Sequence, residues 1–271
     1  MQVSLASTDF LTEIVAKKKN RLGATKIRNP LGQVRSLALD ARARLTPHAL
    51  LKAMKQNVRT NIIAEFKRRS PSRGVIRDDV SAETVARFYE AGGAAAISVL
   101  TEEDYFNGSL DDLRSVRNMV SLPILRKDFI VDEYQIYESA SAEADALLLI
   151  VAALNDHLLA QLRQITEDEL GMDALVEVHT REEMRRALAI GARLIGVNNR
   201  NLKTFAVSLE TSVELASNAP VDVTLVSESG LNTPEDLQKL KTLGYKGFLV
   251  GESLMQARRP DERLRMLIGD G

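Results

Sequence analysis

The stretch ALLLIVAALNDHLLAQLRQITEDELGMDALVEV, residues 146–178, holds the pattern that decides the fold. It begins with a short apolar run at 146–151, continues through an amphipathic helical pattern at 156–170 and ends in a second apolar run at 174–178. Two short apolar runs separated by one helix are typical of a β/α unit, in which successive strands lie parallel.

The same alternation extends from Asn61 to the end of the chain. We expect strands at 62–66, 95–100, 122–126, 146–151, 174–178, 194–198, 223–227 and 247–250. The expected helices between them lie at 82–91, 110–119, 132–140, 156–170, 181–190, 209–217 and 234–243. These units predict an α/β protein with a (β/α)8 or TIM barrel, because no glycine-rich dinucleotide turn follows the first run. An open sheet stays as the alternative, since one sequence does not give the order of the strands.

Polar residues and glycines mark the expected ends of these helices. We expect N-terminal caps at Ser81, Ser109, Asn155, Thr180, Ser208 and Thr233. Gly92, Gly191 and Gly244 stand where helices should end.

Residues 1–60 differ from the rest because they are rich in basic helix formers and are interrupted by two prolines. We interpret them as an N-terminal extension of two or three helices on a single barrel domain spanning residues 1–271. The basic run Lys17, Lys18 and Lys19 is interpreted as a solvated helix face, with a binding patch as the alternative.

Composition narrows the possible functions. The chain has 271 residues, 45% hydrophobic and 27% charged, which is ordinary for a globular protein with a substantial core. Its 36 Lys+Arg nearly balance 37 Asp+Glu, so the net charge attracts neither nucleic acid nor an anionic membrane. With no cysteine, no bilayer-length apolar run and no signal-peptide pattern, we expect a cytoplasmic protein. His48, His157 and His179 lack metal-ligand spacing, so we expect no metal site.

Charged residues occur at the carboxyl ends of the expected strands, where barrel enzymes hold their active sites. Strand alternation places Glu65 and Lys67 toward the barrel interior and Phe66 on the outer face. Because burying an isolated charge is costly, these two groups must pair with each other or serve a ligand. A purely structural ion pair stays as the alternative.

Further ionisable groups stand at other strand ends. Glu177 is flanked by apolar residues, while Lys127, Asn198 and Glu228 end three other strands. Together they favour an acid–base site over a set of partnered core groups. His179 is interpreted as a helix-start residue rather than a general base, and Phe106 and Phe129 as either core or pocket lining.

Glycines and backbone amides follow the last two expected strands, at Ser229, Gly230, Gly251 and Glu252. Many barrels bind phosphate at this place, because glycine allows close approach and helix N-termini supply partial positive charge. The alternative is that these residues form two ordinary strand-to-helix turns that bind no phosphate. The loop from Ser70 to Gly74 is either a plain turn or a capping loop with a phosphate contact. The residues alone thus predict a phosphate-binding barrel enzyme that uses Lys and Glu for acid–base work.

Seven segments of the chain resemble one enzyme family, indole-3-glycerol phosphate synthase, in order and approximate spacing. They are IAEFKRRSPSRG (63–74), SVLTEEDYFNGS (98–109), LRKDF (125–129), ALVEVH (174–179), IGVNNRNL (195–202), VSESG (226–230) and VGESLM (250–255). The resemblance covers essentially the whole chain, including the helical extension.

This resemblance implies a tryptophan-biosynthesis enzyme that converts 1-(2-carboxyphenylamino)-1-deoxyribulose 5-phosphate to indole-3-glycerol phosphate, CO2 and water. It implies no cofactor, a small phosphorylated substrate, and neither a nucleic acid nor a membrane partner. The sequence does not determine the oligomeric state, so a monomer and a non-covalent complex with a partner from the same pathway both stay open.

The resemblance also implies residue roles. Lys127 matches the general acid that protonates the ribulose carbonyl, and Glu177 the carboxylate that assists the later proton removal and dehydration. Glu65 and Lys67 match further acid–base and substrate-anion contacts. Asn198 and Glu228 match positions that orient the ribulose hydroxyls, and Ser70, Ser229, Gly230 and Gly251 match phosphate contacts. At 252 a small polar residue also occurs in the family, so we expect a phosphate contact from the backbone amide of Glu252 and not from its side chain.

Two other functions stay as rivals. A phosphoribosyl-anthranilate isomerase would share the phosphate anchor but would not need Lys127 and Glu177 together. A silent binding protein would have no need of buried acids and lysines at several strand ends.

Overall fold

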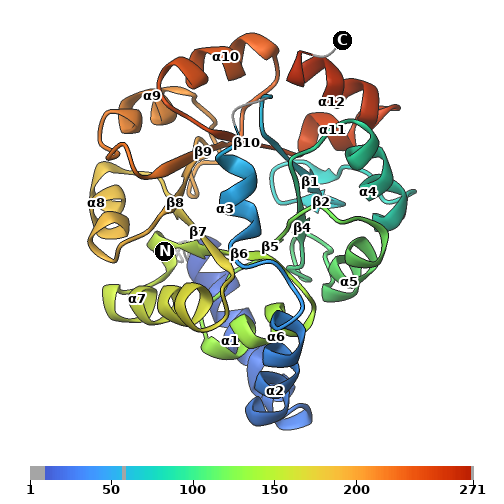
Figure 1. Cartoon of the computed structure of the whole chain (residues 1–271), viewed down its shortest axis with the longest axis vertical. Helices are drawn as coiled ribbons and strands as arrows, with labels where there is room; N and C mark the ends of the chain where they lie inside the picture. The colour runs from blue at the N-terminus through green and yellow to red at the C-terminus, as the bar shows by residue number, and fades with distance from the viewer. Residues whose placement is uncertain (1–9, 57–58, 270–271) are drawn as a thin grey trace, which may run out of the picture.

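The computed structural model describes residues 10–56 and 59–269. The parts of the predicted extension and domain at 1–9, 57–58 and 270–271 lie outside the described residues. Eight parallel strands close into a barrel in the order β1-β10-β9-β8-β7-β6-β5-β4 (Figure 1). They are β1 (Ile62–Phe66), β4 (Ala96–Leu100), β5 (Ile124–Lys127), β6 (Ala146–Ile150), β7 (Asp173–Val178), β8 (Leu194–Asn198), β9 (Thr224–Glu228) and β10 (Gly247–Val250). The predicted (β/α)8 barrel is confirmed, and the open sheet is excluded because β1 pairs with both β4 and β10.

Helices form a ring outside the strands (Figure 1). They are α4 (Ala82–Ala91), α5 (Leu110–Met119), α6 (Glu133–Ser141), α7 (Asp156–Gln164), α8 (Arg181–Ala189), α9 (Glu210–Ala216), α10 (Pro234–Thr242), α11 (Glu252–Met255) and α12 (Pro260–Ile268). A π-helical turn, Ile165–Glu169, continues α7, and a 3-10 turn, Val151–Ala153, follows β6. The loop after β1 contains a short antiparallel hairpin of β2 (Arg69–Ser70) and β3 (Gly74–Val75), which the sequence pattern did not predict.

Five of the six predicted caps are confirmed, and one is wrong. The side chains of Ser81, Ser109, Asn155, Thr180 and Thr233 each accept a hydrogen bond from the first turn of a helix. The N-cap of α9 is Leu209 and not the predicted Ser208. The Ser208 hydroxyl still accepts a bond from the backbone N–H of Glu210, so it serves the same turn from one residue earlier.

The inward and outward faces of the strands follow the predicted alternation. Ile63 packs in the cluster inside the barrel, while Phe66 packs in the outer cluster between strands and helices. Since Glu65 shares the parity of Ile63, its carboxylate points into the barrel. The inner apolar cluster extends from the amino-terminal end of the barrel up to Ile150 and Leu249, and the charged groups at the carboxyl ends of other strands lie beside it.

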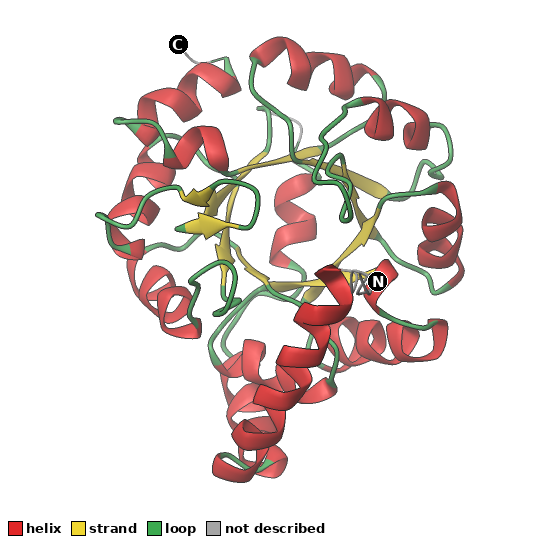
Figure 2. Cartoon of the chain, turned by 180° about the vertical axis from the view of Figure 1, so that it is seen from behind, coloured by secondary structure: helices red, strands yellow, loops and turns green. Residues whose placement is uncertain are grey.

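Three helices precede the first strand in the described part of the chain: α1 (Phe10–Arg28), α2 (Leu31–Arg42) and α3 (Ala49–Met54). Helix α3 lies across the amino-terminal end of the barrel (Figure 1) and packs Leu50 and Met54 into its inner cluster. Helix α1 lies on the opposite end, across the rim of the barrel (Figure 2). The predicted helical extension therefore covers both ends of the barrel.

The prediction of a solvated basic face on α1 is wrong for Lys18. Its ammonium is buried and lies 2.9 Å from Oδ1 of Asp128 and 2.8 Å from Oε2 of Glu103. Asp128 is also paired with Arg126, at 3.0 Å. Burial alone would lower the pKa of Lys18, but the charges of Asp128 and Glu103 outweigh it and raise this pKa. Lys18 thus ties α1 to the residue that follows Lys127.

Candidate active site

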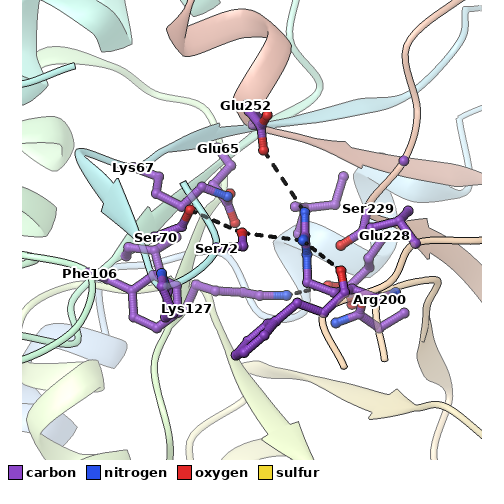
Figure 3. Close-up of a pocket in the computed structure, with 18 of the residues that line it drawn as sticks. Glu65, Lys67, Ser70, Ser72, Phe106, Lys127, Arg200, Glu228, Ser229 and Glu252 are labelled. Carbon is purple, nitrogen blue, oxygen red and sulfur yellow. Dashed lines mark hydrogen bonds and ion pairs between the residues drawn. The ribbon is translucent and has the colours of Figure 1, made fainter. Parts of the chain in front are cut away.

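A cavity of about 340 Å³ opens at the carboxyl ends of the barrel strands (Figure 3). Every residue predicted for the site lines it: Glu65, Lys67, Ser70, Lys127, Glu177, Asn198, Glu228, Ser229, Gly230, Gly251 and Glu252. The barrel therefore brings together residues that stand far apart in the sequence.

Lys127 is the central cation of the cavity. Its side chain extends from β5 across the cavity, and its ammonium donates to Glu228 and, at 3.2 Å, to Oε2 of Glu177 (Figure 3). Burial would lower the pKa of Lys127, but the charges of Glu228, Glu177 and Glu65 outweigh burial and raise it. Lys127 is therefore protonated at neutral pH and can give a proton to a substrate oxygen.

The two carboxylates that contact Lys127 have different electrostatic environments. Burial, together with the nearby charges of Glu177 and Glu65, outweighs the pull of Lys127 and raises the pKa of Glu228 to about 7. Burial also acts on Glu177, but Lys127 and His179 outweigh it and lower its pKa. The pair therefore combines one ionised carboxylate with one that titrates near neutral pH, which is a common arrangement for acid–base work.

Glu65 and Lys67 form an ion pair at the end of β1. The Lys67 ammonium donates to Oε1 of Glu65 at 2.5 Å, and both side chains line the cavity. The structural pair and the ligand-facing role predicted as alternatives are therefore both geometrically present. Gly251 leaves room for this carboxylate, because a Cβ atom at 251 would lie 2.9 Å from the Cβ of Glu65.

Asn198 ends β8 between the acid–base groups and the loops. Its side chain hydrogen-bonds Glu177 and lowers the pKa of that carboxyl, after the larger effects of burial, Lys127 and His179. Its Oδ1 accepts a bond of 3.0 Å from the backbone N–H of Arg200. Asn198 therefore favours the ionised form of Glu177 and holds the start of the following loop.

The predicted phosphate end of the cavity is built by the loops after β1, β8, β9 and β10. Ser229 and Gly230 have positive φ angles of 65° and 77°, so their two backbone amides follow a tight left-handed turn. A Cβ at Gly230 would lie 2.6 Å from Val207. The hydroxyl of Ser253 is buried and has no hydrogen-bond partner among residues 10–56 and 59–269.

The sequence reasoning missed two arginines at this end. Arg73, in the hairpin loop, lies 2.9 Å from Oε1 of Glu252, and Arg200 lies 3.9 Å from Oε2 of the same residue (Figure 3). Arg200 also donates to the hydroxyl of Ser72 at 3.3 Å. Arg200 could have been predicted from its position two residues beyond the end of β8, because a residue at that position still reaches the rim of the barrel where the cavity opens.

The other side of the cavity is apolar. Phe106 and Phe129 lie with their ring centroids 6.3 Å apart, and both line the cavity. Phe10 and Leu11 of α1 also line the cavity. The ring of Phe10 packs edge-on against the rings of Tyr105 and Phe205, with ring centroids 5.0 and 5.3 Å apart. Of the two alternatives left open, Phe106 is pocket lining, while Phe129 lines the pocket and also packs against the inner core cluster.

Within the described ranges, no group of three or more His, Asp or Glu side chains could hold a metal ion. In the same part of the chain, no helix has the length and apolar character needed to cross a membrane.

A sequence model of the indole-3-glycerol phosphate synthase family matches residues 11–267. The indole-3-glycerol phosphate synthase of Carboxydothermus hydrogenoformans is 47% identical over 266 residues, covering 96% of this chain and 99% of the relative. That of Azospirillum brasilense is 46% identical over 266 residues, with the same shares covered. Among solved structures, 3-hexulose-6-phosphate synthase from Salmonella typhimurium superposes with a TM-score of 0.62 at 10% identity, covering 78% of this chain and 97% of that one. This last likeness supports the barrel fold alone.

Proposed function

The chain belongs to the indole-3-glycerol phosphate synthase family, and on that premise we propose that the cavity at the carboxyl ends of its strands is the active site. The enzyme is a carboxy-lyase of tryptophan biosynthesis. It closes the indole ring of 1-(2-carboxyphenylamino)-1-deoxyribulose 5-phosphate and releases CO2 and water.

The contact of one ammonium with carboxylates from different strands carries this proposal. Lys127 is held protonated by Glu228 and Glu177, and a protonated lysine can donate to the ribulose carbonyl oxygen as the ring carbon attacks its carbon. Preorganised charge aimed at a developing oxyanion is among the largest effects in enzyme catalysis. Lys127 is the proposed general acid.

The other carboxylates have proposed roles that follow from their positions. Glu177 has a lowered pKa and is the base that removes the later proton and assists dehydration. Glu65 with Lys67 supplies further acid–base and anion contacts, while Asn198 and Glu228 orient the ribulose hydroxyls.

The two ends of the cavity fit the two ends of the substrate. The aryl ring packs against Phe106 and Phe129, and the phosphate contacts Ser70, Ser229 and the backbone amides of Gly230, Gly251 and Glu252. Because the phosphate is remote from the reacting carbons, its binding energy holds them together and offsets the strain of folding the substrate.

Three further features belong to this proposal. We place the enzyme in the cytoplasm, as a monomer, on a single barrel domain. The site supports a monomer because side chains of one chain surround the cavity from the helix α1 side to the β10 side. Size-exclusion chromatography with light scattering tests this state, and a stable dimer would contradict it.

The function is tested by indole fluorescence during incubation with the carboxyphenylamino-deoxyribulose phosphate, without added metal. We expect turnover by the wild type and a kcat at least about a hundredfold lower for Lys127→Ala, as is usual for loss of a general acid. Circular dichroism checks that the variant is folded. A near wild-type kcat would remove Lys127 from the mechanism, while a folded wild type without indole product would contradict the proposed function.

A further inference from the structure

His179 stands directly after β7, two residues beyond Glu177, and its ring turns back toward that carboxylate. Its Nε2 lies 3.4 Å from Oε1 of Glu177. Oε2 of Glu183, in α8, accepts a bond of 2.7 Å from the backbone N–H of His179 and lies 3.2 Å from its Nδ1. Glu183 therefore holds the proton on Nδ1 and aims Nε2 at Glu177.

The buried Nε2 has no hydrogen-bond partner in the described part of the chain. A buried nitrogen is costly to leave unpaired, so an unpaired Nε2 beside a carboxylate needs an explanation. One explanation is that Nε2 carries a proton during part of each catalytic cycle and then gives it up.

His179 also separates two spaces. Glu177 lines the main cavity, whereas His179 lines a second hollow of about 410 Å³, here named the outer cleft. The outer cleft lies between the starts of α8 and α9 and is also lined by Thr180, Arg181, Ser208, Glu210 and Glu214. The His179 and Glu177 pair therefore spans the wall between the outer cleft and the site.

The reaction needs such a connection, an argument that rests on the proposed function. The carbonyl oxygen takes up two protons and leaves as water, while the carbon between nitrogen and that carbonyl gives up one. The bond to the carboxylate breaks, CO2 leaves, and its electron pair returns to the ring. Each turnover therefore consumes one proton net, and that proton has to reach the site from solvent.

We propose that His179 is a positioning residue that passes this solvent proton from the outer cleft to Glu177. The imidazolium gives its Nε2 proton to Oε1 of Glu177, whose Oε2 lies 3.2 Å from the Lys127 ammonium. Lys127, having protonated the substrate, recovers a proton from Glu177. The neutral ring keeps its Nδ1 proton, so it turns its bare Nε2 toward the outer cleft, takes up a proton from water there and turns back to restore the imidazolium.

The charges around the ring suit this role. Burial lowers the pKa of His179, but the bond to Glu183 and the charges of Glu177, Glu183 and Glu228 outweigh burial and raise it. The groups that face the ring are Glu177 from β7, Glu183 from α8 and Glu228 from β9, with Arg181, Glu210 and Glu214 around the outer cleft. The ring therefore holds a proton in the neutral range and can give it up.

The test is the pH dependence of kcat in two variants. In the wild type, kcat falls at alkaline pH as the imidazolium is lost. His179→Asn keeps an amide donor near Glu177 but cannot titrate, so kcat falls about tenfold and this alkaline limb disappears. In Glu183→Gln the amide oxygen can still accept from the backbone N–H of His179, but the charge is gone, so the limb moves to lower pH.

Two controls separate this proton path from a structural role and from the proposed function. His157→Asn makes the same change at an exposed position of α7 and leaves the limb unmoved. Free imidazole added to His179→Ala should restore kcat through the outer cleft. An unchanged limb in both His179→Asn and Glu183→Gln overturns the proton path while leaving the synthase activity standing. A wild type without turnover overturns both.

Discussion

Gly196 on β8 leaves the space that the carboxylate of Glu228 on β9 occupies. A Cβ atom at 196 would overlap Oε1 of Glu228, and it would also lie 3.3 Å from Leu175. The atom that would have to move is Oε1, at the end of the flexible Glu228 side chain, and not a backbone atom. Gly196 therefore sets where the Glu228 carboxylate lies relative to Lys127 without being a binding residue itself.

Gly196→Ala should lower activity far more than stability. The added methyl group displaces the Glu228 carboxylate from Lys127, so kcat falls about tenfold or more, as expected for a misplaced acid–base group. Combining it with Glu228→Gln should cost little beyond Glu228→Gln alone, because both changes remove one interaction. Full additivity of the two losses would show that Gly196 acts on something else.

Glu228→Gln should stabilise the protein increasingly as pH rises. Folding raises the pKa of Glu228 from 4.5 to about 7, so its favourable contribution is complete below pH 4.5 and is lost as pH rises through 7. The glutamine of the variant does not titrate, so the variant does not lose this stability as the pH rises. The difference in unfolding free energy between variant and wild type should grow by about 1–3 kcal/mol from pH 5 to pH 8. Urea unfolding at the two pH values measures it, and a difference that does not change with pH contradicts the raised pKa.

Ser229→Ala should weaken substrate binding and leave the chemical step nearly unchanged. The hydroxyl is a proposed donor to the phosphate, and a hydrogen bond to a charged group is worth about 1.5–3 kcal/mol. KM should therefore rise about tenfold or more, with kcat close to wild type. An unchanged KM would place the phosphate elsewhere in the cavity.

Lys18→Met should loosen α1. Lys18 loses its contacts with Asp128 and Glu103, but Asp128 keeps Arg126, so we expect a loss of about 1–3 kcal/mol in unfolding free energy. KM should rise as well, because Phe10 and Leu11 of α1 line the cavity.

Lys19→Met is the matched control for this change. Lys19 is exposed on the same helix, so its replacement should change unfolding free energy by less than about 0.5 kcal/mol. Equal effects of the two variants would mean that helix α1 gains nothing from the buried charge.

The sequence was sufficient for features that depend on local period. The alternation of β1 correctly turned Glu65 inward and Phe66 outward, and the strand boundaries lay within two residues of those observed. Because parallel strands end at one rim, residues at strand ends could be assigned to one site before their contacts were known.

Features that depend on tertiary partners could not be predicted in this way. The partners of Lys18 lie 85 residues away at Glu103 and still further along at Asp128, and helical period alone does not reveal them. The arginine contacts of Glu252 and the ring direction of His179 depend on loop conformations that no periodic pattern encodes.

Helix α3 has a consequence for the order in which the chain can assemble. It is made before any barrel strand, yet its inner cluster includes Val226 from β9 and Leu249 from β10, close to the end of the chain. Its docking place is complete only when nearly the whole protein has been synthesised. Until then the apolar face of α3 has no native partner on those two strands. On a chain that is still being synthesised this face is therefore exposed, and its complete burial is among the last events of folding.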